Sequence, residues 1–99
     1  MTAASPGADL RAGEQLLRIH HFRFFTSHGC ALGSVDIVVE EALGPDASAT
    51  GRCMARPHHV RLVTRPDYAV RAGSVDAAVA GLVERLRGHA LSDAFLPTP

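Results

Sequence analysis

Two adjacent histidine pairs, His20–His21 and His58–His59, are the residues of this 99-residue chain best suited to acid–base chemistry. An imidazole titrates near neutral pH, and a neighbouring charge can tune it into a general acid or base. Asp36, or Arg23 two residues after the first pair, could supply that charge. His21 and His20 are therefore the candidate catalytic residues, should the chain be an enzyme.

Binding of a carboxylate is the second chemistry that this region could support. The apolar alternation of residues 16–26 changes phase at His20–His21, which predicts a β-bulge there. A bulge would turn one imidazole and the Arg23 guanidinium to one side, beside a helix start predicted at Ser74, and such groups together bind carboxylates. A regular strand would instead leave His21 and Arg23 on one face. The candidate ligand-binding residues are Arg23, His21 and Ser74.

Metal binding and cysteine catalysis lack supporting motifs. Adjacent residues of a strand point to opposite faces, so neither histidine pair can hold a single ion. No C-x-x-C, H-x-x-x-H or H-E-x-x-H spacing occurs, and no glycine-rich phosphate-binding motif. Cys30 and Cys53 have no local signature of a nucleophile, which favours core or loop cysteines. We therefore predict no metal site and no cofactor.

Charge and hydropathy argue against several kinds of partner. Ten basic residues, all arginine, balance ten acidic ones, so no net field attracts nucleic acid or an anionic membrane. A double-stranded RNA-binding domain would place lysines where residues 74–77 carry an acid. No apolar run approaches the roughly 20 residues of a membrane span, and residues 1–13 lack the pattern of a secretory signal. With only two cysteines, the sequence suits a reducing, cytoplasmic setting.

The elements that position these residues follow one another along the chain. Residues 1–14 are small and polar and predict a flexible arm, and residues 15–96 form a single domain. Strands are expected at residues 16–26, 34–42, 53–55, 60–64 and 68–72. Pro57 is expected to end the third of these strands, and Pro66 to kink the chain before the fifth.

The last predicted element is a helix over residues 74–87. Ser74 is suited to the N-cap, Asp76 to the first turn, and Gly88 to the position after the helix end. Six apolar residues share one stripe of this helix: Val75, Ala78, Val79, Leu82, Val83 and Leu86. The fold class is therefore α+β: an antiparallel sheet of three or four strands with one C-terminal helix packed on it, a βββα-like order.

A single helix covers only part of such a sheet. The predicted core comprises Leu17, Ile19, Phe22, Phe24, Val35, Ile37, Val39, Val60, Leu62, Val75, Val79, Leu82, Val83 and Leu86. Because the apolar residues of 16–26 fall on both faces, the uncovered face needs a second layer. The economical cover is a second copy of the chain, so a homodimer is expected.

Two segments resemble a known family. HHFRFFTSHGCALGSVDIVVEE has the form strand, polar turn ending in A-L-G, and strand, and YAVRAGSVDAAVAGLVERL has the form strand, G-S-x-D, and helix. Both are similar to a repeat of the C-terminal regulatory, dimerising domain of 2-isopropylmalate synthases. The matching residues are Ala31–Leu32–Gly33 and Gly73–Ser74 with Asp76. The resemblance implies a βββα unit that pairs with a second unit and binds an amino-acid effector between them, so two single-unit chains would pair.

These observations favour a stand-alone regulatory or small-molecule-binding dimeric module of bacterial biosynthesis, whose ligand is a small carboxylate-bearing metabolite. The alternative is a small single-domain enzyme of specialised metabolism, of isomerase, cyclase or hydrolase type, with His20 or His21 as acid–base. A third possibility is an accessory subunit without a ligand.

Overall fold

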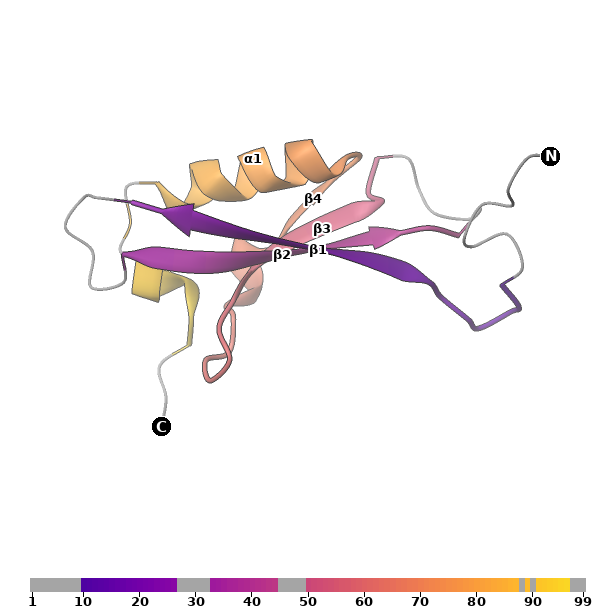
Figure 1. Ribbon diagram of the computed structural model, residues 1–99, viewed down its shortest axis with the longest axis horizontal. Helices are drawn as coiled ribbons and strands as arrows, with labels where there is room; N and C mark the ends of the chain where they lie inside the picture. The colour runs from indigo at the N-terminus through magenta and orange to yellow at the C-terminus, as the bar shows by residue number, and fades with distance from the viewer. Residues whose placement is uncertain (1–9, 27–32, 45–49, 88, 90, 97–99) are drawn as a thin grey trace.

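Four strands form one antiparallel sheet in the order β1-β2-β3-β4 in the computed structural model, which describes residues 10–26, 33–44, 50–87, 89 and 91–96. The elements are β1 (Leu17–Phe25), β2 (Ser34–Ala42), β3 (Cys53–His58), the 3-10 helix η1 (Pro66–Tyr68), β4 (Val70–Ala72), α1 (Val75–Leu86) and the 3-10 helix η2 (Leu91–Ala94). Figure 1 shows α1 lying along one side of the strands. The predicted α+β class, with one helix on an antiparallel sheet, is confirmed.

The pairing of β1 with β2 is regular along its whole length. Leu17 pairs with Ala42 and Phe25 with Ser34, with no unpaired residue between them. The bulge predicted at His20–His21 is therefore wrong. The change of phase has another cause: β1 is the edge strand farthest from α1, so neither of its faces has to be uniformly apolar.

The third strand continues through Pro57, which corrects the prediction that this proline ends it. β4 pairs only with residues Cys53 to Ala55 of β3. Beyond Ala55, therefore, β3 has a paired strand on one side only. A proline, which lacks the N–H donor, is tolerated where a strand is an edge.

Residues 60–64, predicted to be a strand, form an irregular loop. Val60 is 85% exposed and Val63 is 65% exposed, and of the apolar residues in this loop only Leu62 packs against the core. The loop is held by the chain after α1, because the Val63 carbonyl accepts from the Leu96 N–H at 2.8 Å. The Arg65 N–H also donates to the Ala94 carbonyl at 2.8 Å, and these two bonds, on either side of Thr64, form an isolated antiparallel bridge between Thr64 and Phe95.

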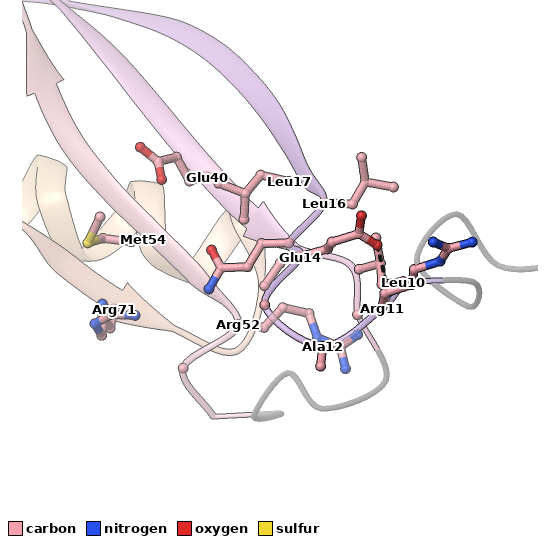
Figure 2. Close-up of a pocket in the computed structure, with 15 residues that line it drawn as sticks. Leu10, Arg11, Ala12, Glu14, Leu16, Leu17, Glu40, Arg52, Met54 and Arg71 are labelled. Carbon is pink, nitrogen blue, oxygen red and sulfur yellow. Dashed lines mark hydrogen bonds between the residues drawn. The ribbon is translucent and has the colours of Figure 1, made fainter.

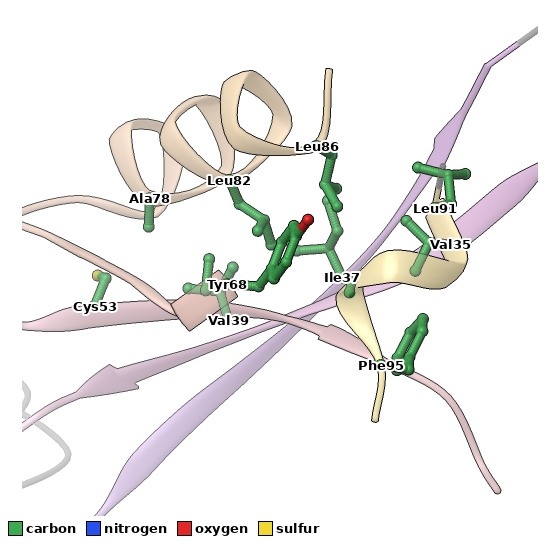
Figure 3. Close-up of a cluster of buried hydrophobic side chains, with 12 residues drawn as sticks. Val35, Ile37, Val39, Cys53, Tyr68, Ala78, Leu82, Leu86, Leu91 and Phe95 are labelled. Carbon is green, nitrogen blue, oxygen red and sulfur yellow. The ribbon is translucent and has the colours of Figure 1, made fainter. Parts of the chain in front are cut away.

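The core lies between α1 and the face of the sheet formed by alternate residues of β2, β3 and β4. Figure 3 shows the side chains of Ala78, Leu82 and Leu86 directed from α1 toward the strands. The buried members of the core are Val35, Ile37, Val39, Cys53, Ala55, Tyr68, Ala78, Leu82, Leu86, Leu91, Ala94 and Phe95. Leu91 and Phe95, from the chain after α1, pack back into this core.

Four residues of the predicted core lie instead at the surface. Leu17, Ile19 and Phe22 of β1 are 38%, 45% and 39% exposed, and Val60 lies in the loop described above. The β1 residues are exposed because α1 packs on β2, β3 and β4. Phe24, by contrast, is partly buried against the edge of the core.

The helix begins and packs as its sequence predicts. The Ser74 hydroxyl accepts from the Ala77 N–H at 3.1 Å, and the helix ends at Leu86 with Arg87 as C-cap. The predicted stop at Gly88 lies outside the described residues. A Cβ on Gly81 would come within 2.8 Å of Val70 Cγ1, so this glycine lets α1 approach β4 closely. Within the described part of the chain, no helix has the length and apolar character needed to cross a bilayer.

Replacing Leu82 by alanine is expected to lower the free energy of unfolding by about 2–5 kcal/mol, because the side chain is completely buried and its loss leaves a cavity. Urea unfolding followed by circular dichroism measures this change. Val63→Ala, a truncation on the exposed loop, is the control and should cost below about 0.5 kcal/mol. An equally small effect of Leu82→Ala would contradict the packing of α1 on the sheet.

Candidate functional site

The sheet face turned away from α1, here called the outer face, carries most of the charged side chains of the strands. Of the residues that strand alternation and the pairing register place on this face, ten form its central part: Ile19, His21, Arg23, Asp36, Val38, Glu40, Met54, Arg56, His58 and Arg71. The register aligns them in three rows across the sheet. Two of these rows contain one carboxylate each, so the outer face holds more cations than anions.

The first row runs Arg23–Asp36–His58 across β1, β2 and β3. The Arg23 Nε donates to the Asp36 Oδ1 at 2.7 Å. This hydrogen bond, helped by the charges of Arg23, His58 and His21, holds the pKa of Asp36 below its usual value despite some desolvation. The same bond raises the pKa of Arg23. Asp36, suggested by the sequence as a charge beside a histidine, is bonded to the Arg23 guanidinium instead.

The second row is His21–Val38–Arg56, and its central residue is buried. Val38 is 6% exposed although it points away from α1 and lies outside the core cluster. Its in-register neighbours are the side chains of His21 and Arg56, one on each side. Arg56 also forms an ion pair with Glu40 of the next row. The middle of the outer face is therefore a small apolar position enclosed by paired polar groups.

A cavity of about 760 Å³ opens at the end of the outer face where β1 begins. Figure 2 shows its wall on the sheet, with Glu40, Met54 and Arg71 on neighbouring strands. The opposite wall is the irregular segment 10–16, which turns at Gly13 and is held by the Arg11 N–H donating to Glu14 Oε1 at 2.7 Å. The apolar side chains lining the cavity include Leu10, Leu16, Leu17 and Met54.

Two arginines give this cavity its charge. Arg52 and Arg71 line it, and neither guanidinium has a hydrogen-bond or ion-pair partner among the residues that the structure describes. Arg11 also belongs to the lining, but Figure 2 shows its guanidinium directed away from the cavity. Arg23 and Arg56, on the same face, already bind carboxylates. Arg52 and Arg71 are therefore the outer-face guanidiniums left to bind an anion.

The structure brings together only some of the residues predicted as a site. His21 and Arg23 share the outer face, as expected for a regular strand, and His20 points to the other face. Ser74 follows β4, three strands from β1, which is roughly 14 Å across the sheet. Its hydroxyl caps α1 on the side opposite the outer face. Ser74 therefore does not join His21 and Arg23.

His20 forms a separate pair with Glu41. The His20 Nε2 and Glu41 Oε1 atoms are 2.9 Å apart, and both side chains are about three-quarters buried. The Arg18 guanidinium lies 3.9 Å from the same carboxylate oxygen. A carboxylate hydrogen-bonded to an imidazole orients the ring, which is the arrangement that general-base histidines use.

The remaining histidines and the described cysteine do not assemble a further site. His58 faces Asp36, whereas the His59 ring packs edge-on against Phe95 with centroids 5.9 Å apart. Cys53 is buried in the core, and this burial raises the pKa of its thiol. Cys30 lies outside the described residues. Among the described residues, no group of three or more His, Cys, Asp or Glu side chains is placed to hold a metal ion.

Sequence reasoning missed Arg52, Arg71 and Met54. A usable signal was present, because the order Arg52-Cys53-Met54-Ala55-Arg56 alternates large or charged residues with small apolar ones. That alternation predicts one face for Arg52, Met54 and Arg56. Which strand brings Arg71 beside Met54 depends on the register, which only the structure supplies.

Comparisons with known proteins identify no relative. No protein-family model matches the chain, and neither the curated proteins nor the solved structures give a significant match. The geometry of the chain itself therefore carries the functional argument.

Replacing Arg23 by glutamine is expected to raise the Asp36 pKa toward its usual value of 3.8, because both the hydrogen bond and the positive charge are lost. Since the folded pKa of Asp36 is depressed, its stabilising contribution is present above the unfolded pKa and is lost as pH falls through the folded value. A ¹³C NMR titration of the Asp36 carboxyl measures the shift. Arg61→Gln, on the loop, should leave it unchanged, and an unchanged pKa in Arg23→Gln would contradict the bond.

Proposed function

We propose that the chain is a stand-alone regulatory or small-molecule-binding module that acts as a dimer in the cytoplasm and binds a small carboxylate-bearing metabolite. The observation that carries this proposal is the cavity whose two guanidiniums, Arg52 and Arg71, have no carboxylate partner among the described residues. Arginine binds carboxylates through two parallel hydrogen bonds. An arginine left unpaired beside a cavity is suited to that role.

The rest of the cavity lining indicates which carboxylates fit. Leu10, Leu16, Leu17 and Met54 offer an apolar wall, and Glu40 offers an acceptor for an amino or hydroxyl group. Pockets for small molecules combine such apolar walls with a few polar groups that fix orientation. A 2-oxo or 2-amino acid with an apolar side chain matches both features. The resemblance to the regulatory domain of 2-isopropylmalate synthases, in Gly73–Ser74 and the following helix, supports the same class of ligand.

Binding at this cavity is expected to depend on both arginines. Addition of 4-methyl-2-oxopentanoate or leucine should raise the melting temperature, and at one hundred times Kd the stabilisation is about 2.7 kcal/mol. Arg52→Met and Arg71→Met should each abolish the response, because each removes a charged donor from the cavity. Thermal-shift titration measures it.

The matched control is Arg61→Met, since Arg61 is an exposed loop arginine that does not line the cavity. It should respond as the parent chain does. A full response in both cavity variants would place the ligand elsewhere, and no response of the parent chain to any amino or 2-oxo acid would refute this class of ligand.

A second function is favoured by the His20–Glu41 pair: a small enzyme of isomerase, cyclase or hydrolase type with a strand-one histidine as general base. About three-quarters buried and oriented by a carboxylate at 2.9 Å, His20 meets that requirement better than His21. His21 lies on the outer face, and its in-register neighbour is Val38.

Proton exchange tests this enzymatic alternative directly. If His20 is a general base, the chain should accelerate deuterium exchange at C3 of a 2-oxo acid in D₂O, followed by ¹H NMR. His20→Gln should remove the acceleration, and His59→Gln, which alters an imidazole packed on Phe95, should not. Absence of any acceleration by the parent chain would contradict the enzymatic reading for this reaction class.

A further inference from the structure

Strand β1 has one backbone edge that no described part of the chain pairs with. It is nine residues long and has β2 on its other side. The opposite edge of the sheet is β4, which has only three residues. Long unpaired strand edges recruit other strands, and soluble proteins protect them with prolines, lysines or bulges. β1 contains none of these three protections.

The side chains of β1 also leave this edge accessible. Ile19, Phe22 and Phe25 are 45%, 39% and 70% exposed. The two arginines of the strand do not block pairing at the free edge, because both side chains are directed toward β2. Arg23 binds Asp36 at 2.7 Å, and Arg18 lies 3.9 Å from Glu41. This edge therefore carries exposed apolar side chains, and no strand of the described part of the chain pairs with its backbone groups.

We propose that β1 pairs antiparallel with β1 of a second copy, about a two-fold axis that passes through Phe22, so that two sheets join into one of eight strands. This inference takes the dimeric state from the proposed function and assigns its surface, axis and register. Isologous contact about a two-fold axis is the commonest form of homo-oligomer. Pairing a strand with its own copy satisfies both free edges at once.

Symmetry leaves few registers for such a pair. The two-fold axis is perpendicular to the sheet, so the helix-bearing faces of both copies lie on the same side. Residues directly opposite each other point to the same face. Side chains alternate between the two faces, so the numbers of two directly opposite residues must differ by an even number. The two-fold axis therefore passes through a residue position and not between two positions.

Side-chain chemistry then selects Phe22. With the axis there, Phe22 meets the partner's Phe22, and Ile19 meets the partner's Phe25. Centring on Arg23 would oppose two guanidiniums, and centring on His21 would place Ile19 against the partner's Arg23. Apolar and aromatic cross-strand pairs stabilise a sheet, whereas like charges directly opposite destabilise it.

This register completes a site that one chain holds only in part. The partner's His21 lies directly opposite Arg23, which is hydrogen-bonded to Asp36. Directly opposite residues have Cβ atoms about 4.5–5.5 Å apart, closer than the ~6.8 Å between residues two apart on one strand. The row Arg23–Asp36–His58 thus gains an imidazole from the second copy. His21 and Arg23, placed on one face within each chain, meet at close range across the axis.

Cysteine cross-linking tests the axis residue by residue. In a Cys30→Ser background, three variants each carry one surface cysteine on the same face of β1: His20→Cys, Phe22→Cys and Phe24→Cys. Cys53 is retained because it is buried. Mild oxidation should give a disulfide-linked dimer with Phe22→Cys alone, since the other two positions lie four residues from their own copies. A cross-link strongest at position 20 or 24, or none in a particle that is dimeric, would overturn the register.

Sedimentation equilibrium separates this inference from ligand binding. The parent chain should have twice its 10.5 kDa mass at 100 µM, and Phe22→Asp should sediment as a monomer with an unchanged circular dichroism spectrum. Val63→Asp, a charge placed on an exposed valine of the loop, should remain dimeric. A monomeric parent chain would overturn both the dimer and its axis, while the thermal response to a carboxylate would still decide the cavity by itself.

Discussion

The sheet is wider than the one helix that packs on it, and this difference in width determines which strands are covered and which are exposed. A helix with its side chains is about 10–12 Å across, whereas the outer strands of a four-stranded sheet lie roughly 14 Å apart. α1 starts two residues after β4 ends, at a serine cap, and so lies back over β4, β3 and part of β2. β1 is the strand beyond its reach. The partly exposed phenylalanines of β1 and its free edge both follow from that one mismatch.

Because no helix or strand of the described chain packs on the outer face, charge has to be balanced there locally. Two guanidiniums and two carboxylates pair on it, Arg23 with Asp36 and Arg56 with Glu40. Such exposed pairs contribute little to stability, and their effect is to use up the acids of the face. What remains is a cationic excess at one end, next to the segment that contains Gly13 and closes the cavity. The proposal of a carboxylate ligand rests on this excess of cations over anions.

The helix and the second strand could be predicted from sequence because each carries its own periodicity. The stripe from Val75 to Leu86 has the helical repeat, and Ser34–Ala42 alternates with period two. The bulge prediction failed since a phase change looks the same whether a strand kinks or simply lies uncovered at an edge. The strand prediction for residues 60–64 was wrong for a related reason. Their β-branched composition is a local property, whereas a strand also requires a partner strand. β3 is already paired with β4 over Cys53–Ala55.

The candidate site was accessible from sequence only in part, because sites built across a sheet depend on register. Pairs within one strand, such as His21 with Arg23, follow from alternation alone. Pairs between strands, such as Arg23 with Asp36 or Met54 with Arg71, require knowing which residues stand opposite each other. Ser74 was predicted to belong to the site because it begins the helix. It lies three strands from His21 and Arg23 across the sheet, so it does not belong to the same site. The sequence therefore predicts which residues of one strand share a face, but not which residues of neighbouring strands lie side by side.

One row of the outer face connects the cavity with the free edge. It runs Ile19–Glu40–Met54–Arg71, from β1 across to β4. In the proposed dimer Ile19 packs against the partner's Phe25, while Glu40, one strand away, and Arg71, three strands away, line the cavity. Glu40 lines the cavity and pairs with Ile19, so a proposed interface contact and a wall of the cavity are neighbours in this row. By thermodynamic linkage, any preference of the ligand for the paired state must equal the amount by which the ligand strengthens pairing. If both proposals hold, this row would be the physical connection between the bound metabolite and the pairing of two copies.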